Sequence, residues 1–325
     1  MQRHERIDSE RLTLVLAADG TQPPTLIYFG KRLPDAQDLT ELQASQAIGW
    51  RESTPDLQPP QTILPTNGWG WMGEAALRAH AAEAPAPIRW SSCKMQRHDN
   101  EIDIALHADI PGVLVNLNWA LDAKTGVLST RATIENTGKD PLHLSQLASL
   151  YLPVSPRMSE ILAFEGDWSR ELQPSRFTAP PGLWRKINRT GRTGFAGSTF
   201  LTLEPDAGDF SGAATAVHLA WSGNHELTVE TLPDGRRAMI ASALLDDGEI
   251  ILAPGETFAA PCAYVSRSLD GFNGVSDAFH PFLRDNILPA TAHGARKVHF
   301  NSWESVGFEF NEAELLDLAD SCAAI

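Results

Sequence analysis

The chain has 325 residues, and 42% of them are hydrophobic, so it can bury a substantial core in one or two domains. Its 26 Lys and Arg residues against 41 Asp and Glu residues give a net charge of −15. Nucleic acids and anionic membranes are bound by clustered basic side chains, so this charge balance excludes an electrostatic footprint for either partner.

The N-terminal segment carries charged side chains throughout its first dozen positions, followed by only a short apolar patch. It is therefore not predicted to be a signal peptide. No apolar run approaches the roughly 18 residues that a membrane-spanning helix needs. We expect a cytoplasmic protein, with secretion by another route left open.

Short runs rich in β-branched and aromatic residues fill the chain from its start to about residue 265, and Gly, Pro, Asn and Asp close most of them. The predicted strands are 11–17, 25–29, 101–108, 113–120, 127–135, 142–152, 200–203, 214–220, 226–232, 237–244 and 249–253. Apolar and polar residues alternate in segments such as 101–107, which is typical of half-buried antiparallel strands. The fold class predicted is mainly β, a large antiparallel sandwich.

The pattern changes near residue 269. Apolar residues at helical spacing predict a helix over 274–288, and a compact strand over 296–300 precedes a second helix over 311–325 with a capping pair, Asn311 and Glu314. A lone strand and helix leave backbone groups without partners. Either this tail begins a larger α/β domain, or it packs irregularly on the sandwich; the absence of a C-cap glycine at the chain end favours the first.

Motifs for metals and cofactors are missing. The three cysteines, Cys93, Cys262 and Cys322, are far apart, which indicates reduced buried thiols rather than disulfides or a zinc site. The ten histidines show no H-x-H or H-E-x-x-H spacing, and no phosphate-binding or dinucleotide-binding glycine motif occurs. We predict neither a metal nor a cofactor.

The stretch 65–71 places Trp69 and Trp71 among glycines. Such a loop is bendable and offers rigid, flat faces that suit stacking on a sugar ring. The alternatives are that the two indoles fill the edge of the sandwich or an oligomer interface.

Several short segments together resemble family 36 α-galactosidases, over nearly the whole chain. The tail resembles the first strand, loop and helix of their catalytic barrel, and the preceding residues resemble their N-terminal β-supersandwich. The segments that carry the resemblance are GDWSRE at 166–171, NRTGRT at 188–193, WSGNH at 221–225, LAPGE at 252–256 and NSWE at 301–304.

This resemblance implies three parts: a β-supersandwich over 1–268, a linker helix over 269–295, and the first strand and helix of an incomplete (β/α)₈ (TIM) barrel over 296–325. It also implies a retaining hydrolase that removes terminal α-linked galactose from oligosaccharides such as melibiose or raffinose by double displacement. Both catalytic Asp residues of the family lie on later barrel strands, and 298–325 supplies about 28 of the roughly 250 residues of a barrel. We therefore expect no catalytic residue before Ile325 and no activity from this chain alone.

The resemblance further implies a set of substrate-binding residues. Asn301, Trp303 and Glu304 would lie at the rim of the barrel, where strand ends face the substrate. Trp303 could instead pack between barrel and sandwich, and Glu304 could be merely solvated. Trp69 and Trp71 would belong to a loop that, in tetrameric members, reaches a neighbouring subunit's active site. That loop departs from the family, because Trp71 begins a Trp-Met-Gly run where many members have Asp-Phe-Arg.

The partners implied are α-galactoside oligosaccharides and, for the full-length protein, further copies of itself in a dimer or tetramer. An alternative function is a stand-alone carbohydrate-binding or interaction sandwich that does not cleave its ligand. A longer chain with an acidic pair would favour the first hypothesis, and saturable binding of galactose oligosaccharides by these residues alone would favour the second.

Overall fold

The computed structural model describes residues 3–46, 59–68, 70–81, 87–195, 198, 200–204, 207–297 and 299–324. The chain divides into two compact units, Met1–Phe282 and Leu283–Ile325, here called the sandwich unit and the C-terminal unit. Trp69, predicted to contact sugar, lies outside the described residues.

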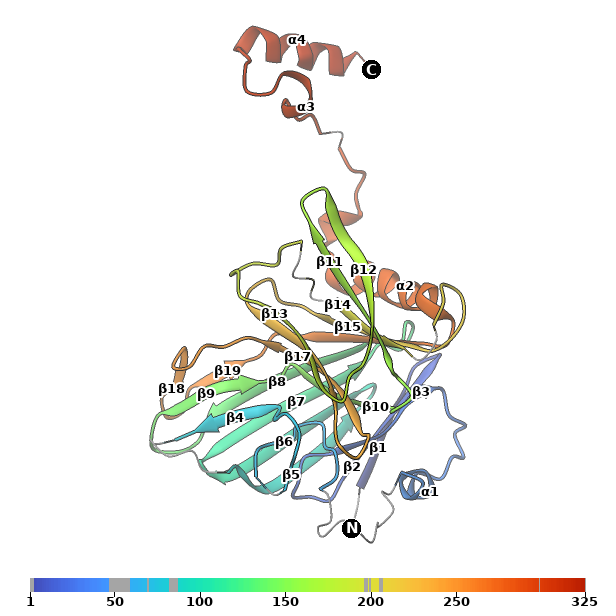
Figure 1. Cartoon of the computed structure of the whole chain (residues 1–325), viewed down its shortest axis with the longest axis vertical. Helices are drawn as coiled ribbons and strands as arrows, with labels where there is room; N and C mark the ends of the chain where they lie inside the picture. The colour runs from blue at the N-terminus through green and yellow to red at the C-terminus, as the bar shows by residue number, and fades with distance from the viewer. Residues whose placement is uncertain are drawn as a thin grey trace. The chain divides into compact units, whose positions relative to one another are not determined.

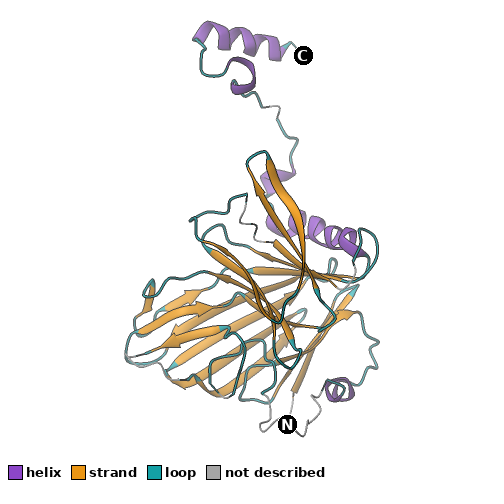
Figure 2. Cartoon of the chain, viewed as in Figure 1, coloured by secondary structure: helices purple, strands orange, loops and turns teal. Residues whose placement is uncertain are grey.

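The sandwich unit is built almost entirely of antiparallel strands (Figures 1 and 2). Its strands are β1 (Arg3–Asp8), β2 (Leu12–Ala18), β3 (Thr25–Lys31), β4 (Leu77–His80), β5 (Arg89–His98), β6 (Glu101–Ile110), β7 (Val113–Leu121), β8 (Leu128–Asn136), β9 (Leu142–Leu147), β10 (Leu150–Val154), β11 (Glu160–Asp167), β12 (Arg170–Thr178), β13 (Gly182–Asn188), β14 (Phe200–Glu204), β15 (Ala214–Leu219), β16 (His225–Thr231), β17 (Arg237–Ala243), β18 (Ile250–Leu252), β19 (Thr257–Ala259) and β20 (Ala263–Ser268). Its helices are α1 (Leu39–Ala44) and α2 (Gly271–Phe282). The prediction of a mainly β, antiparallel supersandwich is confirmed.

The described strands form four sheets. The largest has ten strands in the order β12-β11-β14-β15-β20-β8-β7-β6-β5, with β19 also paired to β8. The others have the orders β10-β17-β16-β13, β1-β2-β3 and β18-β9-β4. In β7 and β8 buried positions alternate with more exposed ones, as expected for strands with one face on a core. One large apolar cluster, which includes Ile104, Leu106 and Tyr151, joins these sheets.

The predicted strand 142–152 is two strands in the structure. The chain leaves β9 and enters β10, which belongs to a different sheet, through Ala148 and Ser149. The N–H of Ala148 donates to the carbonyl of Ala76 at 2.7 Å, and the carbonyl of Ser149 accepts from Oγ1 of Thr130 at 2.8 Å. The apolar run is continuous because both of these strands are buried, so sequence pattern could not show the change of sheet.

Helix α2 begins three residues before and ends six residues before the predicted 274–288. Phe282 packs edge-on against Tyr264 at 5.3 Å, and Phe279 packs edge-on against Phe200 at 6.1 Å, so the helix covers strands β14, β15 and β20 (Figure 1). Pro281 has no N–H to donate within the helix, and the next residues adopt a π-helical turn over Leu283–Ile287.

The C-terminal unit contains α3 (Trp303–Val306) and α4 (Glu312–Ala323), after a 3₁₀ turn at Ala290–His293. The capping box between Asn311 and Glu314 is present, as predicted. The described residues of 296–300 form no strand, whereas the sequence pattern predicts one. A strand needs a neighbouring strand for its backbone hydrogen bonds, and none is available to this segment in the part of the chain that is described. The sequence-based domain boundaries stay predictions.

The cysteines are free thiols, of which Cys93 is buried, Cys262 half-buried and Cys322 exposed. The prediction of reduced thiols is therefore confirmed, and that of burial holds fully only for Cys93. Among the described residues, no helix combines the length and the apolar character required to cross a membrane.

Candidate functional site

The predicted sugar-binding loop lies on the edge of the sandwich unit. Residues 65–74 are here called the Trp71 loop. Near its start, Thr66 forms an isolated β-bridge with Leu77. The N–H of Trp71 donates to the carbonyl of Gly68 at 3.0 Å, and that of Ala76 donates to the carbonyl of Pro65 at 2.7 Å. The loop is thus closed on itself by backbone hydrogen bonds.

Trp71 is held by its own surroundings. Its Nε1 donates to the carbonyl of Glu74 at 3.0 Å, and its ring meets Tyr151 edge-on with centroids 6.4 Å apart. The guanidinium of Arg236 lies 5.4 Å from the ring centroid, within range of a cation–π interaction. The ring is half-buried against the main core, as the sandwich-edge alternative requires. A contact between Trp71 and sugar stays a prediction.

A buried carboxylate anchors the Trp71 loop. Glu230 on β16 is only 5% exposed, and its Oε1 accepts the N–H of Glu74 at 2.7 Å. The hydroxyl of Tyr151 donates to Glu230 Oε2 at 3.4 Å and accepts from Nε2 of Gln61 at 3.3 Å. A Cβ on Gly73 would lie 2.8 Å from Glu230 Oε2, so the loop can approach the carboxylate only because this residue is glycine.

Ion pairs surround this anchor without neutralising it directly. The Glu74 carboxylate pairs with Arg78 at 2.5 Å and with Arg185 at 3.2 Å. Arg185 also lies 3.7 Å from Glu226. Glu230 is bonded instead to a neutral N–H and a hydroxyl, and its burial raises the pKa of its carboxyl above the usual range.

This raised pKa predicts a pH dependence of stability. In the folded state Glu230 binds a proton at a higher pH than in the unfolded state, where the pKa of a Glu carboxyl is about 4.3. The carboxyl's contribution to stability therefore falls as pH rises through the window between the two pKa values. As the pH is lowered from 7 to 5, we expect the free energy of unfolding of the wild type to increase relative to that of Glu230→Gln. Urea unfolding of both proteins across this range measures it, and parallel curves would contradict it.

Sequence reasoning did not find Glu230 or Tyr151. The sequence pattern predicted a strand over 226–232 and gave no sign that Glu230 is buried. In the structure β16 lies inside a sheet that is covered on both sides, and four successive residues from Leu227 to Glu230 are buried. The run of small and apolar residues in the neighbouring β17, buried at every position, is the signal that could have indicated this.

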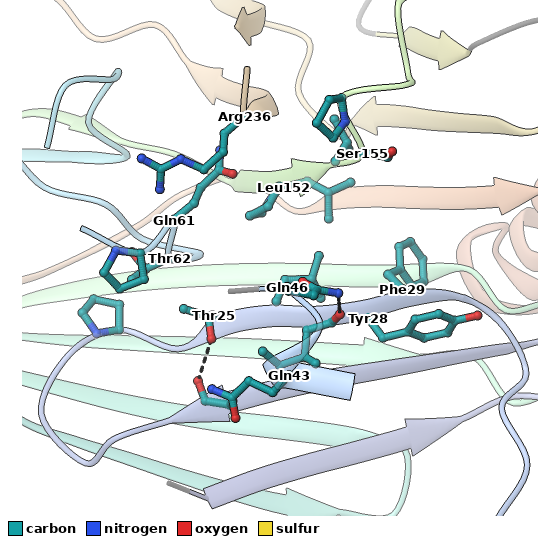
Figure 3. A pocket seen from close by; sticks show the side chains of 18 of the residues that line it. Thr25, Tyr28, Phe29, Gln43, Gln46, Gln61, Thr62, Leu152, Ser155 and Arg236 are labelled. Carbon is teal, nitrogen blue, oxygen red and sulfur yellow. Dashed lines mark hydrogen bonds between the residues drawn. The ribbon is translucent and has the colours of Figure 1, made fainter. Parts of the chain in front are cut away.

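The sandwich unit also contains a large cleft of about 960 Å³ (Figure 3). Its walls come from β3, α1, the end of β10 and residues 60–62. A smaller apolar pocket of about 170 Å³ adjoins it and is lined by Trp71 and Trp90. Among the described residues that line the cleft, Asp19 carries the only carboxylate, and its Oδ1 accepts the N–H groups of Thr21 and Gln22. Hydrolysis of a glycoside needs two carboxylates. The described lining supplies one, so the cleft does not contain a catalytic acid pair.

The other predicted site residues lie in the C-terminal unit. Asn301 Oδ1 accepts the N–H of Trp303 at 3.0 Å, which places both at the start of α3, with Glu304 exposed in its first turn. Trp303 is 56% exposed and meets Phe308 edge-on at 4.6 Å. The three residues are thus brought together by one turn of helix. Their contact with substrate stays a prediction.

Two family models match the chain in succession. The N-terminal domain of glycosyl hydrolase family 36 matches residues 22–253, and the melibiase family matches residues 257–325. Because the first match covers more than half of the chain, the chain belongs to glycosyl hydrolase family 36.

Individual relatives agree. The chain is 30% identical to an α-galactosidase of Escherichia coli over an alignment of 326 positions, which covers 98% of this chain and 44% of the relative. It is 26% identical to α-galactosidase C of Emericella nidulans, over 68% of this chain and 30% of the relative. The chain therefore spans less than half the length of these relatives.

Solved structures show the same fold. An α-galactosidase from Lactobacillus brevis aligns with a TM-score of 0.88 and 22% identity, over 99% of this chain and 47% of that structure. A variant of the α-galactosidase AgaA from Geobacillus stearothermophilus, solved with stachyose, aligns with a TM-score of 0.85 and 20% identity, over 98% and 48%. The resemblance stated from short sequence segments is confirmed.

Proposed function

We propose that this chain is the N-terminal portion of a retaining α-galactosidase that hydrolyses terminal α-linked galactose in oligosaccharides. The observation that carries the proposal is the ordered match of both family models, together with an α-galactosidase relative aligned over 98% of this chain but 44% of its own length. The proposed substrates follow from relatives, since AgaA has been solved with raffinose and with stachyose. The proposed location is the cytoplasm.

The proposed role of the sandwich unit is to support the barrel, to make contacts between subunits of a homo-oligomer, and to contribute to the rim of the sugar site. Trp69 and Trp71 would contribute from the Trp71 loop, and Asn301, Trp303 and Glu304 from the start of α3. The C-terminal unit supports this view. Helix α4 has no buried residue, and Phe308 is 84% exposed, which fits a segment that packs against further barrel elements.

The proposal predicts a difference in activity between two proteins. The 325-residue chain is expected to release no 4-nitrophenol from 4-nitrophenyl α-D-galactopyranoside, because the described residues bring no acid pair into the cleft. The same chain, extended by whatever its reading frame encodes beyond Ile325, is expected to hydrolyse that substrate with retention of anomeric configuration. Release of galactose by the 325-residue chain itself, free of contaminating enzyme, would overturn the proposal, as would an inactive extended chain that folds.

A further inference from the structure

The cleft of the sandwich unit carries more polar side chains than a packing defect would. Figure 3 shows Gln61, Ser155 and Arg236 on one side of it, and Thr25, Gln43 and Gln46 on the other. The rings of Tyr28 and Phe29 lie on the same side as Gln46 and offer flat apolar surfaces. Amides and hydroxyls beside aromatic rings are the groups that bind hydroxylated ligands, and a volume of about 960 Å³ is in the range of small-molecule sites.

One charged group in this cleft lacks an acidic partner. Arg267 lies on β20, and its Nη1 donates to Oγ1 of Thr215, its partner on β15, at 2.6 Å. Within the described residues, its guanidinium makes one further polar contact, a long one of 3.9 Å from Nη1 to Sδ of Met158. The Nε of Arg267 is buried without a hydrogen-bond acceptor. No carboxylate among the described residues lies within 4 Å of the Arg267 guanidinium.

The surroundings of Arg267 do not compensate for this. Tyr28 interacts electrostatically with Arg267, but the Tyr28 hydroxyl already donates to the carbonyl of Lys31 at 2.8 Å. Arg237, by contrast, donates from Nε to Thr231 and from Nη1 to the carbonyls of Pro156 and Met158. A half-buried guanidinium whose Nε–H has no acceptor is costly, and a bound anion is a common way to offset that cost.

The charge of the cleft is also opposite to that of the chain. Its described lining contains two arginines, Arg236 and Arg267, and one acid, Asp19, in a protein of net charge −15. Arg236 forms an ion pair with Asp234 at 2.7 Å, and the Asp19 carboxylate already accepts the backbone N–H of Thr21. Arg267 is thus the group that would attract an anion to this position.

We propose that the cleft binds a small polyhydroxylated anion, a sugar phosphate or a sugar carboxylate, whose acidic group lies on the guanidinium of Arg267. The hydroxyls of the ligand would bond to Nε2 of Gln43 and Oε1 of Gln61, because Gln43 Oε1 is bonded to His4 and Gln61 Nε2 to Tyr151 and the carbonyl of Arg237. The ring of the ligand would lie against Tyr28. This inference does not depend on the proposed hydrolase activity, because every residue involved belongs to the sandwich unit.

Calorimetric titration of the 325-residue chain tests the proposal, with galactose 1-phosphate, galacturonate, galactose and inorganic phosphate as probes. We expect saturable binding of one or both acidic sugars, with the tighter of the two identifying the acidic group. Arg267→Gln is expected to weaken binding by about ten-fold or more, since charge-assisted hydrogen bonds to the acid are lost. Arg11→Gln, which removes the same charge at an exposed position outside the cleft, is the control and should change little.

Thermal unfolding shows whether Arg267→Gln is folded, so that a loss of binding can be distinguished from a loss of structure. Arg267→Gln removes a half-buried charge that has no acidic partner among the described residues, and its amide can still donate to Thr215, so it should lower the melting temperature of the ligand-free chain little. A saturating acidic sugar should raise the melting temperature of the wild type and leave that of Arg267→Gln nearly unchanged. The proposal is overturned if neither acidic sugar binds, if galactose or inorganic phosphate binds as tightly as they do, or if Arg267→Gln binds like the wild type.

Discussion

Replacing Gly271 with alanine is expected to lower the free energy of unfolding by about 3–4 kcal/mol, because it combines backbone strain with overpacking. Gly271 begins α2 with a φ of +65°, and an added Cβ would lie 2.2 Å from the carbonyl oxygen of Gly208 and 2.7 Å from the backbone nitrogen of Ser211. Both neighbours are backbone atoms, so no side chain can rotate away.

The reason for this close approach is the way in which α2 is attached. The first N–H groups of the helix, from Phe272 and Asn273, donate to the carbonyls of Gly208 and Asp209 at 3.1 and 2.8 Å. A shift of the loop to admit a methyl group would break these bonds and loosen the apolar face of the helix.

Gly248→Ala is the matched control for Gly271→Ala. Gly248 also has a positive φ, +81°, but an added Cβ would meet nothing within 4 Å. Only the conformational cost should appear, about 1–2 kcal/mol. Urea unfolding followed by tryptophan fluorescence compares the two variants, and equal losses would show that the contact with the 208–211 loop does not matter.

Replacing Glu230 with alanine is expected to cost about 2 kcal/mol or more, because a buried donor left without an acceptor costs about 1–3 kcal/mol. Two donors lose their acceptor, the N–H of Glu74 and the hydroxyl of Tyr151. The substitution should destabilise the Trp71 loop more than it destabilises the rest of the sandwich unit. Hydrogen exchange at the amides of Glu74 and Ala76 is expected to accelerate more than exchange in the distant strand β7.

Glu230→Gln is the control for this change, because its amide oxygen can still accept the Glu74 N–H. It should retain most of the stability at neutral pH and most of the protection of the Trp71 loop. If Glu230→Ala leaves the exchange of Glu74 unchanged while the chain stays folded, the carboxylate does not anchor the loop.

Much of the sandwich could be predicted from sequence wherever one local rule sufficed. Two aspartates before a glycine, as at 246–248, are typical of a turn, and Gly248 does adopt a positive φ. The Asn311 and Glu314 capping box was equally visible, because it depends on residues three positions apart.

Other strands could not be predicted, for identifiable physical reasons. In β5 the buried residues Trp90, Cys93 and Met95 do not alternate strictly, because a register shift between Trp90 and Ser92 breaks the period of two. Strand β12 is exposed at nearly every position, so it shows no apolar pattern at all. Its hairpin with β11 carries Trp168, 81% exposed, at the turn between the two strands.

The candidate site divides in the same way. The aromatic loop was proposed from residue type, and the cluster of Asn301, Trp303 and Glu304 from the family resemblance. Glu230 and Arg267, by contrast, act through neighbours on other segments of the chain. Glu230 meets Glu74 across 156 residues of sequence, and Arg267 meets Thr215 across 52. Such pairs depend on the three-dimensional fold, and a single sequence contains no local sign of them.

The largest sheet is joined across a long interval of sequence, and this affects how the protein is made. Thr130 on β8 pairs with Ala263 on β20, which follows 133 residues later. At about 5–20 residues per second, a ribosome needs roughly 7 to 27 seconds to synthesise that interval, and until then this edge of β8 has no permanent partner. The nascent polypeptide is therefore expected to depend on chaperones during translation, and slower elongation before β20 should increase its aggregation.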